Sequence, residues 1–387
     1  MVLSRRQPGR NAMPDPASLR ILHVLRAPVG GLFRHVVDLA RGQAQLGHRV
    51  GIVCDATTGG ERAEATLAAL GGDLSLGVTR LPMARLPGLG DLAGALRVRA
   101  LVSHLGPDVV HGHGAKGGLY ARLAARTDGR RPARVYTPHG GSFHYPPGTA
   151  QHWLYMAAER ALARRTDFFL FESAYIARLA AEALGSLAAR SAVVYNGLHE
   201  AEFDEVPRSG TRDVLYIGEL RHLKGIDTLI DALAQLRAEG RQLTAVFVGA
   251  GPDEEAIRAH AADRGLGEAV TFQRPMPIRE ALALARVMVV PSRAESLPYV
   301  VLEATAAAMP LVATAVGGIP EIFGPQAGRL VPADAPEALA GALRRRLDMP
   351  EAEAQAEDAA LRAFVRERFS LPQMVASVLD AYRAALR

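Results

Sequence analysis

The sequence predicts an α/β protein with two doubly wound, Rossmann-like domains that face a common cleft. The chain has 387 residues, more than one hydrophobic core usually encloses, so two domains are expected. Short apolar runs alternate with longer amphipathic segments, which is the pattern of βαβ units and parallel sheets. This series stops at a turn signal, Asn196-Gly197, and then starts again. A hydrophobic fraction of 49% and a charged fraction of 22% exclude a mainly disordered or fibrous chain.

The first domain is expected over residues 19–200, where apolar runs predict six strands. These runs are Leu19–Leu25, Val50–Cys54, Asp108–His111, Val135–Thr137, Phe168–Phe171 and Ala192–Tyr195. An amphipathic pattern over Leu32–Leu46 predicts the helix that follows the first strand. Residues 198–212, with Pro207, Ser209 and Gly210, have the composition of a linker.

The second domain is expected over residues 211–370 and repeats the pattern. Its apolar runs are Val214–Ile217, Thr244–Val248, Ala269–Phe272, Val287–Val290, Leu311–Thr314 and Arg329–Val331. The last segment, residues 371–387, predicts one more amphipathic helix. Because ligands of such sheets bind beyond the carboxyl ends of the strands, the informative residues should directly follow a strand.

Cysteine use and the early residues indicate the compartment. Cys54 is the single cysteine, so neither an internal disulfide nor a thiol-based zinc or iron–sulfur site is expected, and a reducing compartment follows. The first 18 residues carry Arg5, Arg6 and Arg10 without the apolar core of a secretory signal, and no later window has the ~20 apolar residues of a membrane span. We therefore expect a cytoplasmic protein.

The two halves of the chain differ in charge. Residues 1–200 carry 24 basic and 14 acidic side chains, a net charge of +10, and residues 201–387 carry 21 and 26, a net charge of −5. A basic first half suits a phosphorylated substrate or an anionic lipid surface. Its arginines are scattered, with no dense basic run and no aromatic-rich RNA-binding signature, so no nucleic-acid partner is expected.

One predicted helix of the first domain leaves two interpretations open. It carries aromatic and basic side chains, namely Trp153, Tyr155, Arg160, Arg164 and Arg165. Such a helix can lie on the anionic inner face of a membrane, or it can pack its aromatic side chains into the protein. The apolar face is modest, so inward packing is slightly favoured.

Two carboxylates, Glu295 and Glu303, flank a turn that directly follows the predicted strand Val287–Val290. Pro298 suits the first position of a helix, and Ser296 suits the cap before it. The backbone amides of Ser296 and Leu297 should then face the cleft together with the positive end of the helix dipole, as a site for phosphate. A solvated glutamate pair is the alternative, but the position after a strand favours a site.

Lys224 is one of only two lysines and lies in the segment Gly218–Gly225, between a predicted strand and a helix. An ammonium group at a helix start opposes the dipole, so it indicates a nearby anion. Arg221 can help as a bidentate partner of a diphosphate. Taken alone, a surface loop lysine is an equally good interpretation.

Glycine turns follow two predicted strands, at Gly30-Gly31 and at Gly249 and Gly251. Both permit close approach by a ligand. The second turn fails as a dinucleotide fingerprint, because Pro252 replaces the third glycine and no acidic residue ends the next strand. An NAD-dependent dehydrogenase is therefore disfavoured.

Three histidines follow strands of the first domain and should face the cleft: His111, His113 and His139. A metal site needs a further ligand with suitable spacing, and the sequence offers neither that ligand nor an Asp-x-Asp motif. We expect no metal. A lone histidine is more often structural than functional. Of the three, His139 is the best candidate for a functional role.

Taken together, these residues resemble glycosyltransferase family 4, whose members are retaining enzymes of the GT-B fold. The resemblance covers about residues 20–385. The motifs that carry it are Gly30-Gly31 with Arg34-His35-Val36, Asp108 to His113, Thr137-Pro138-His139-Gly140, Asn196-Gly197, Gly218 to Gly225, the pair Glu295 and Glu303, and Gly317 to Glu321.

The resemblance implies a role for each motif. The first domain would bind the acceptor and the second the nucleotide sugar, and the C-terminal helix would cross back to the first domain. Glu295 would bind hydroxyls of the donor sugar, Glu303 the ribose, and Lys224 the diphosphate, with His139 facing the sugar. The family usually has an arginine directly after the glycine at 218, where this chain has Glu219. Either Arg221 supplies that guanidinium, or Glu219 orients Arg221.

The implied activity is retaining, metal-independent transfer from a nucleotide-diphosphate sugar, without a cofactor. Family frequency favours uridine, and the acceptor would be a glycan or a lipid-linked sugar of cell-surface polysaccharide biosynthesis. Two alternatives stay open: a sugar-nucleotide epimerase of the same fold, and a noncatalytic nucleotide-sugar-binding subunit, which the change to Glu219 keeps in view. The sequence does not identify the sugar, the acceptor or the oligomeric state.

Overall fold

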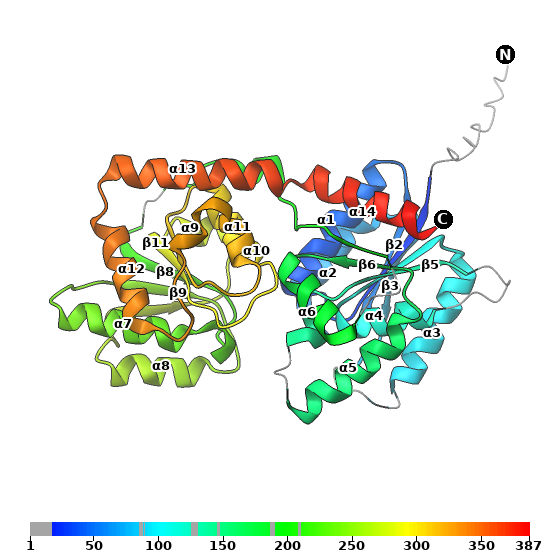
Figure 1. Cartoon of the computed structure of the whole chain (residues 1–387), viewed down its shortest axis with the longest axis horizontal. Helices are drawn as coiled ribbons and strands as arrows, with labels where there is room; N and C mark the ends of the chain where they lie inside the picture. Colours follow the sequence, from blue (N-terminus) through cyan, green and yellow to red (C-terminus); the bar gives the residue numbers. More distant parts are fainter. Residues whose placement is uncertain are drawn as a thin grey trace, which may run out of the picture.

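The computed structural model describes residues 18–84, 88, 90–124, 131–144, 148–185, 190–207 and 210–387. Arg5, Arg6 and Arg10, and Ser209 of the predicted linker, lie outside these residues. The described chain forms two α/β domains side by side, joined on one side by the last two helices (Figure 1). Each domain contains one parallel sheet covered by helices.

Within the described residues, seven parallel strands form the sheet of the first domain, in the order β3-β2-β1-β4-β5-β6-β7. They are β1 (Arg20–Leu25), β2 (Arg49–Asp55), β3 (Gly77–Leu81), β4 (Val109–His113), β5 (Ala133–Thr137), β6 (Phe168–Phe171) and β7 (Arg190–Val193). The helices between them are α1 (Gly30–Gln45), α2 (Gly60–Gly71), α3 (Gly90–Leu105), α4 (Gly114–Leu123), η1 (Gly141–His144), α5 (Ala150–Ala163) and α6 (Ala174–Leu184).

The described part of the second domain has a five-stranded parallel sheet, in the order β10-β9-β8-β11-β12. Its strands are β8 (Arg212–Ile217), β9 (Ala245–Val248), β10 (Val270–Gln273), β11 (Ala285–Val290) and β12 (Leu311–Ala313). Its helices are η2 (Glu200–Phe203), η3 (His222–Lys224), α7 (Ile226–Ala238), α8 (Glu254–Asp263), α9 (Ile278–Leu282), α10 (Tyr299–Ala306), α11 (Ile319–Phe323), η4 (Gly324–Arg329), α12 (Pro336–Asp348) and α13 (Glu351–Arg368).

The C-terminal helix α14 (Leu371–Ala385) belongs to the core of the first domain. It packs against α1, β5 and β6, and Figure 1 shows it in line with α13 across the two domains. Its apolar residues recur at helical spacing, so one stripe is buried: Met374, Val375, Val378, Leu379 and Tyr382. The expectation that this helix crosses back to the first domain is confirmed.

The sheets differ from the sequence prediction in two places. The strand β3 was not predicted, because it is short and half-buried and so lacks a continuous apolar run. The predicted strand Arg329–Val331 is wrong: residues up to Arg329 belong to η4, and Val331 forms only an isolated bridge to Thr314. Pairing at a single residue does not extend the second sheet beyond β12.

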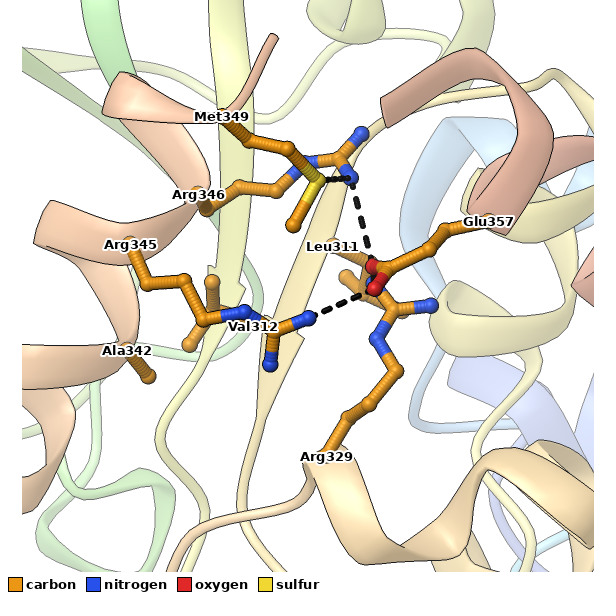
Figure 2. A pocket seen from close by; sticks show the side chains of 8 residues that line it. All are labelled: Leu311, Val312, Arg329, Ala342, Arg345, Arg346, Met349 and Glu357. Atoms are coloured by element: carbon orange, nitrogen blue, oxygen red, sulfur yellow. Dashed lines mark hydrogen bonds and ion pairs between the residues drawn. The ribbon is translucent and has the colours of Figure 1, made fainter. Parts of the chain in front are cut away.

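A cluster of charges joins the outer helices of the second domain (Figure 2). Glu357 of α13 pairs with Arg345 of α12 at 2.5 Å and with Arg329 at 3.2 Å, while Arg346 pairs with Asp358. The cavity among these side chains is about 30 Å³, room for about two water molecules. The cluster is therefore a structural ion network, and its cavity is too small for a nucleotide.

No helix among the described residues is both long enough and apolar enough to cross a membrane.

Candidate active site

A cavity of about 710 Å³ lies between the two domains, at the carboxyl ends of strands from both sheets. Most of the residues predicted for the site line it: Gly30, Gly31, His139, Gly218, Arg221, Lys224, Glu295, Ser296, Leu297 and Glu303. Two parallel sheets thus direct loops from opposite sides into one space, the usual position of a ligand in doubly wound domains.

Lys224 and Glu295 form an ion pair in the wall of the second domain. Lys224 Nζ lies 2.6 Å from Glu295 Oε1, and the Ser292 hydroxyl donates to the same carboxylate at 2.7 Å. Gly317, in the left-handed region at φ +59°, lets a neighbouring loop pass this site, since a Cβ there would lie 1.8 Å from the Glu295 carbonyl oxygen. The anion that accompanies Lys224 is thus a carboxylate of the protein itself.

The loop before α10 is held by its carbonyl groups. The Ser296 carbonyl accepts from the amide of Gly318 at 2.8 Å, and the Leu297 carbonyl accepts from Asn196 Nδ2 at 2.9 Å. The predicted helix start is wrong by one residue: Pro298 is the cap residue, α10 begins at Tyr299, and no side chain caps it. Because Pro298 is extended (ψ 122°), it ends the loop and does not form the first helical turn.

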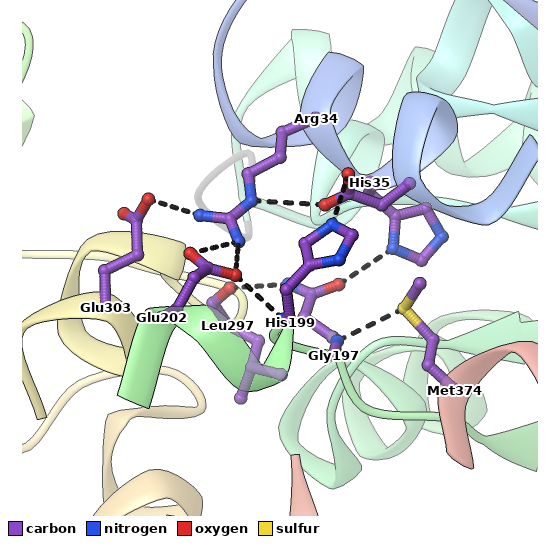
Figure 3. A network of polar contacts seen from close by, with 10 residues as sticks. Arg34, His35, Gly197, His199, Glu202, Leu297, Glu303 and Met374 are labelled. Atoms are coloured by element: carbon purple, nitrogen blue, oxygen red, sulfur yellow. Dashed lines mark hydrogen bonds and ion pairs between the residues drawn. The ribbon is translucent and has the colours of Figure 1, made fainter. Parts of the chain in front are cut away.

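Glu303 pairs with Arg34, which reaches across from α1 of the first domain (Figure 3). The same guanidinium donates to both oxygens of Glu202 at 2.6 and 2.7 Å and stacks over the Tyr299 ring at 4.3 Å. Burial raises the pKa of Glu303, and the charge of Arg34 acts against that rise. The predicted ribose-binding carboxylate is therefore joined to the other domain in this structure.

Arg221 and Glu219 form a pair at the rim of the cavity. Arg221 Nη1 lies 3.7 Å from Glu219 Oε2, and both side chains are exposed. Of the two predicted interpretations, this geometry resembles Glu219 orienting Arg221. The long, exposed pair leaves the guanidinium able to turn toward an anion.

Gly249 and Gly251 lie outside the set of described residues that line the cavity. A Cβ at Gly249 would lie 1.9 Å from the Gly218 carbonyl oxygen, and one at Gly251 would lie 2.2 Å from that of Leu220. These glycines hold the loop 218–220 close to the sheet. Gly249 and Gly251 therefore support the site from behind, whereas the sequence predicted close approach by a ligand at this turn.

Five histidines of the first domain gather beside the cavity: His23, His35, His111, His113 and His139. Parallel pairing of β1 with β4 sets His23 beside His111. Burial lowers the pKa of every one of them, to about 4 for His23 and His35. His139 also has a strained backbone in the left-handed region, at φ +50°, which is uncommon for a non-glycine residue and concentrates at functional sites.

Hydrogen bonds order the protons of these neutral rings. The side-chain oxygen of Gln43, Oε1, accepts from His23 Nε2 at 2.9 Å, so His23 Nδ1 accepts from His113 Nε2 at 3.0 Å. His113 Nδ1 then accepts from His139 Nε2 at 3.1 Å. This order of protons leaves His139 Nδ1 unprotonated, so it can accept a hydrogen bond.

The expectation that these histidines lack a further potential ligand is wrong. His23, His111 and His113 bring nitrogen atoms within 4.8 Å of one another, and so do His35, His113 and His139. Sequence spacing does not detect such sets, because His23 and His35 come from β1 and α1, far from the others in the chain. The absence of a bound metal stays a prediction.

A second cavity, of about 530 Å³, lies within the first domain and shares His139 and Leu32 with the first one. Its lining is largely apolar and includes Ala27, Val29, Leu32, Leu119, Leu154, Tyr155 and Leu162. The charged side chains of the lining are Arg26, the ion pair of Asp91 and Lys116, and Glu159. A ligand of the second cavity would thus meet a ligand of the first one at His139.

The helix α5 divides its aromatic side chains between the core and the solvent. Tyr155 is half-buried against the core, as inward packing requires. Trp153 and Leu154 are 69% and 59% exposed, so inward packing is wrong for Trp153.

The predicted site residues leave out several charged residues in or next to the site, among them Arg34, Glu172 and Glu321. Arg34 joins the domains, Glu172 lines the first cavity, and Glu321 accepts from the amides of Ala174 and Tyr175 at the start of α6. Arg34 and Glu321 lie within motifs already singled out, whereas Glu172 directly follows the strand β6. Its position after a strand was the signal that could have found it.

Comparisons with known proteins agree with this architecture. The family model "Glycosyltransferase Family 4" matches residues 29–202, and "Glycosyl transferases group 1" matches residues 199–362. A glycogen synthase of Mycobacterium tuberculosis is 29% identical, over 93% of this chain and 92% of its own. A D-inositol 3-phosphate glycosyltransferase of Catenulispora acidiphila is 30% identical over 72% of each chain.

Among solved structures, Anabaena HepE in complex with UDP-glucose superposes with a TM-score of 0.75 at 21% identity, covering 94% of this chain and 99% of that one. The fold is thus that of the GT-B glycosyltransferases. From the two family matches and the similarity to the inositol phosphate enzyme, this chain belongs to glycosyltransferase family 4.

Proposed function

We propose that the protein transfers a sugar, with retention of configuration and without a metal ion, from a uridine diphosphate sugar to a glycan or lipid-linked acceptor in cell-surface polysaccharide biosynthesis. The observation that carries the proposal is the pair of Lys224 and Glu295 facing His139 across one cavity. It combines a cation for a diphosphate, a carboxylate for sugar hydroxyls and a ring acceptor. The UDP-glucose bound to the structurally similar HepE supports the choice of donor class.

Charge separation is the main demand of this reaction. As the bond between the anomeric carbon and the diphosphate breaks, the electron pair leaves with the phosphate oxygen. Lys224 would exchange Glu295 for that oxygen, with Arg221 turning in from the rim, and preorganised electrostatics of this kind is usually the largest catalytic contribution. These two cations would serve where other transferases use a divalent ion.

Glu295 and Glu303 would bind hydroxyls once their present partners turn to the ligand. Glu295, released by Lys224, accepts from the donor sugar, and Glu303, released in part by Arg34, accepts from the ribose. The acceptor hydroxyl attacks the anomeric carbon from the face that the phosphate leaves, and its proton passes to the departing phosphate oxygen. Glu295 therefore binds the sugar and forms no covalent intermediate, unlike the carboxylate of a retaining glycosidase.

The second cavity supports a transferase over an epimerase. An epimerase needs room for one nucleotide sugar, whereas here a separate, largely apolar space meets the first cavity at His139. An acceptor with an apolar part fits that lining. The exposed Trp153 and Leu154 on α5, beside this space, support transient contact with the inner face of an anionic membrane.

The deciding experiment combines ligand binding with product analysis. Thermal shifts with UDP-glucose, UDP-galactose, UDP-N-acetylglucosamine and GDP-mannose should identify the donor, since binding to the folded state raises the melting temperature. Proton NMR of the product should then give an α linkage from an α-linked donor. An inverted linkage contradicts retention, conversion of the donor alone supports the epimerase, and tight binding without turnover over a broad acceptor panel supports the noncatalytic subunit.

Membrane contact has its own test. The protein should sediment with phosphatidylglycerol liposomes at low salt and not with phosphatidylcholine liposomes, and Trp153→Ser should weaken that association. Equal sedimentation of the variant would contradict a role for this helix.

A further inference from the structure

Glu172 is a buried carboxylate that the reaction outlined above does not use. It directly follows β6, and Ser173 after it caps α6 through its hydroxyl. Its side chain lines the cavity between the domains, although only 1% of the residue is exposed. The position at the carboxyl end of a strand, at the junction of the two domains, is where ligands of this fold bind.

Neither carboxylate oxygen of Glu172 has a protein partner with good hydrogen-bond geometry. Burial raises its pKa to about 7, while the backbone amides of His139 and Gly140 and the Ser296 hydroxyl lower it without offsetting the burial. None of the largest contributions to this balance comes from an arginine or a lysine. Buried polar groups are nearly always hydrogen-bonded, so two unsatisfied oxygens in a cavity wall indicate a missing ligand.

The neighbours of Glu172 identify that ligand by chemistry. On one side is the loop of His139, and on the other is Ser296, beside the carboxylate of Glu295. Glu172 is absent from the lining of the second cavity, so it faces the donor side. A carboxylate at this position accepts hydrogen bonds from sugar hydroxyls and repels the anionic oxygens of a diphosphate, so its oxygens suit the sugar.

We propose that Glu172 is a further substrate-binding residue, whose two oxygens hydrogen-bond a hydroxyl group of the sugar being transferred. The inference rests on the proposed function, since it takes the first cavity as the donor site. It adds a contact from the first domain to the sugar, opposite Glu295. A contact of this kind gives the enzyme selectivity among sugars that differ at one hydroxyl, because a site built to bind a hydroxyl rejects the analogue that lacks it.

The test compares affinities for UDP and UDP-glucose by calorimetry in the wild-type protein, Glu172→Ala and Glu172→Gln. Glu172→Ala should weaken UDP-glucose binding at least 10-fold and leave UDP binding within twofold, with Glu172→Gln between them. If UDP-glucose does not bind the wild type, GDP-mannose and GDP replace the pair. Glu182→Gln, an exposed carboxylate on α6, is the matched control and should change neither affinity.

Deoxy analogues of the donor locate the hydroxyl. One of the 2-, 3-, 4- and 6-deoxy sugars should bind the wild type about 10-fold more weakly and bind Glu172→Ala no more weakly than the parent donor. The inference is overturned if Glu172→Ala loses affinity for UDP and UDP-glucose equally, or if both variants keep the wild-type affinity for UDP-glucose. It is also overturned if every deoxy analogue still shows its full loss of affinity in Glu172→Ala. A wild-type protein that binds none of the nucleotide sugars overturns the proposed function as well, which separates the two failures.

Discussion

The two walls of the interdomain cavity accommodate buried polar groups in opposite ways. On the wall of the second domain, charges pair: Lys224 with Glu295, and Glu303 with Arg34 from across the cavity. On the wall of the first domain, burial favours the neutral forms: it lowers the pKa of His139 and raises that of Glu172. Desolvation acts on both walls, but only one of them has opposite charges close enough to compensate.

This difference teaches how each wall can respond to a ligand. A charged wall whose groups are already paired binds an anion by exchange, since Lys224 must turn from Glu295. A neutral wall with unsatisfied atoms binds by addition, since His139 Nδ1 and both oxygens of Glu172 gain partners without losing any. The first wall should therefore control charge in the reaction, and the second should control the shape and hydroxyl pattern of the sugar.

The largest effect is expected for Lys224→Met, which breaks the charged wall at its centre. Removing one preorganised donor to a developing charge typically costs 10²–10³-fold in turnover, so we expect a kcat roughly 10³-fold lower. Initial rates at saturating donor measure it. Arg286→Met, which removes an exposed cation of the second domain that lines neither cavity, is the control and should leave kcat near the wild-type value. A folded Lys224→Met protein with near-normal turnover would contradict the exchange mechanism.

In the neutral wall, a substitution at Glu172 should stabilise the fold, whereas most substitutions of buried charged residues destabilise it. Its pKa is about 7 in the folded protein and ordinarily 4.5, so the folded state loses stability as the pH rises from about 4.5 to about 7. The full penalty, roughly 3 kcal/mol, applies above pH 7. Glu172→Gln should therefore increase the free energy of unfolding at pH 8 and leave it unchanged at pH 4.

Chemical denaturation at the two pH values measures this effect. Glu159→Gln is the control, because Glu159 is also buried but pairs with Arg122 at 2.6 Å. This variant should have a lower free energy of unfolding than the wild type. Destabilisation of both variants would remove the distinction between a paired and an unpaired buried carboxylate.

A smaller effect is expected for Arg34→Met, which separates the walls. The variant leaves Glu303 and Glu202 close together without their shared cation, and a loss of about 1.5–3 kcal/mol in the free energy of unfolding follows from hydrogen bonds to charged groups. Most of the loss should persist in 0.5 M salt, because the charged groups of this network are mostly buried and salt weakens buried pairs little. Arg178→Met, in an exposed pair on α6, should change stability by less than about 0.5 kcal/mol. A loss that disappears in high salt would place Arg34 among ordinary surface charges.

The smallest effect concerns Glu321→Gln, at the contact that holds the walls together. Its carboxylate accepts from two amides at the start of α6, at 2.8 and 2.9 Å. The amide side chain keeps one acceptor and loses the favourable charge at the helix N-terminus, so a loss of about 0.5–1 kcal/mol is expected. Thermal unfolding of the variant beside Glu337→Gln, on α12 away from the interface, measures it. A larger loss for the control would contradict the capping role.

Sequence periodicity predicted the sheets because buried parallel strands are continuous apolar runs, and it failed at β3, where the run is interrupted. The position rule also predicted Lys224, Glu295 and His139, since each follows a strand. The position rule does not predict which side chains pair. The sequence does not reveal that Lys224 contacts Glu295 or that Arg34 crosses to Glu303, because side-chain directions decide both. Gly249 and Gly251 follow a strand yet face the loop behind the site, which shows that the rule gives a neighbourhood and not an orientation.

The place of α14 has a consequence for synthesis. Its residues Met374, Val378 and Tyr382 complete a core whose other members were made long before them, and the Tyr382 hydroxyl lies 2.7 Å from His111 Nδ1. During synthesis, the first sheet therefore leaves the ribosome while the apolar surface that α14 covers is still open and His111 lacks its Tyr382 partner. The nascent amino-terminal half should need shielding by a chaperone until the final turns emerge and seal it.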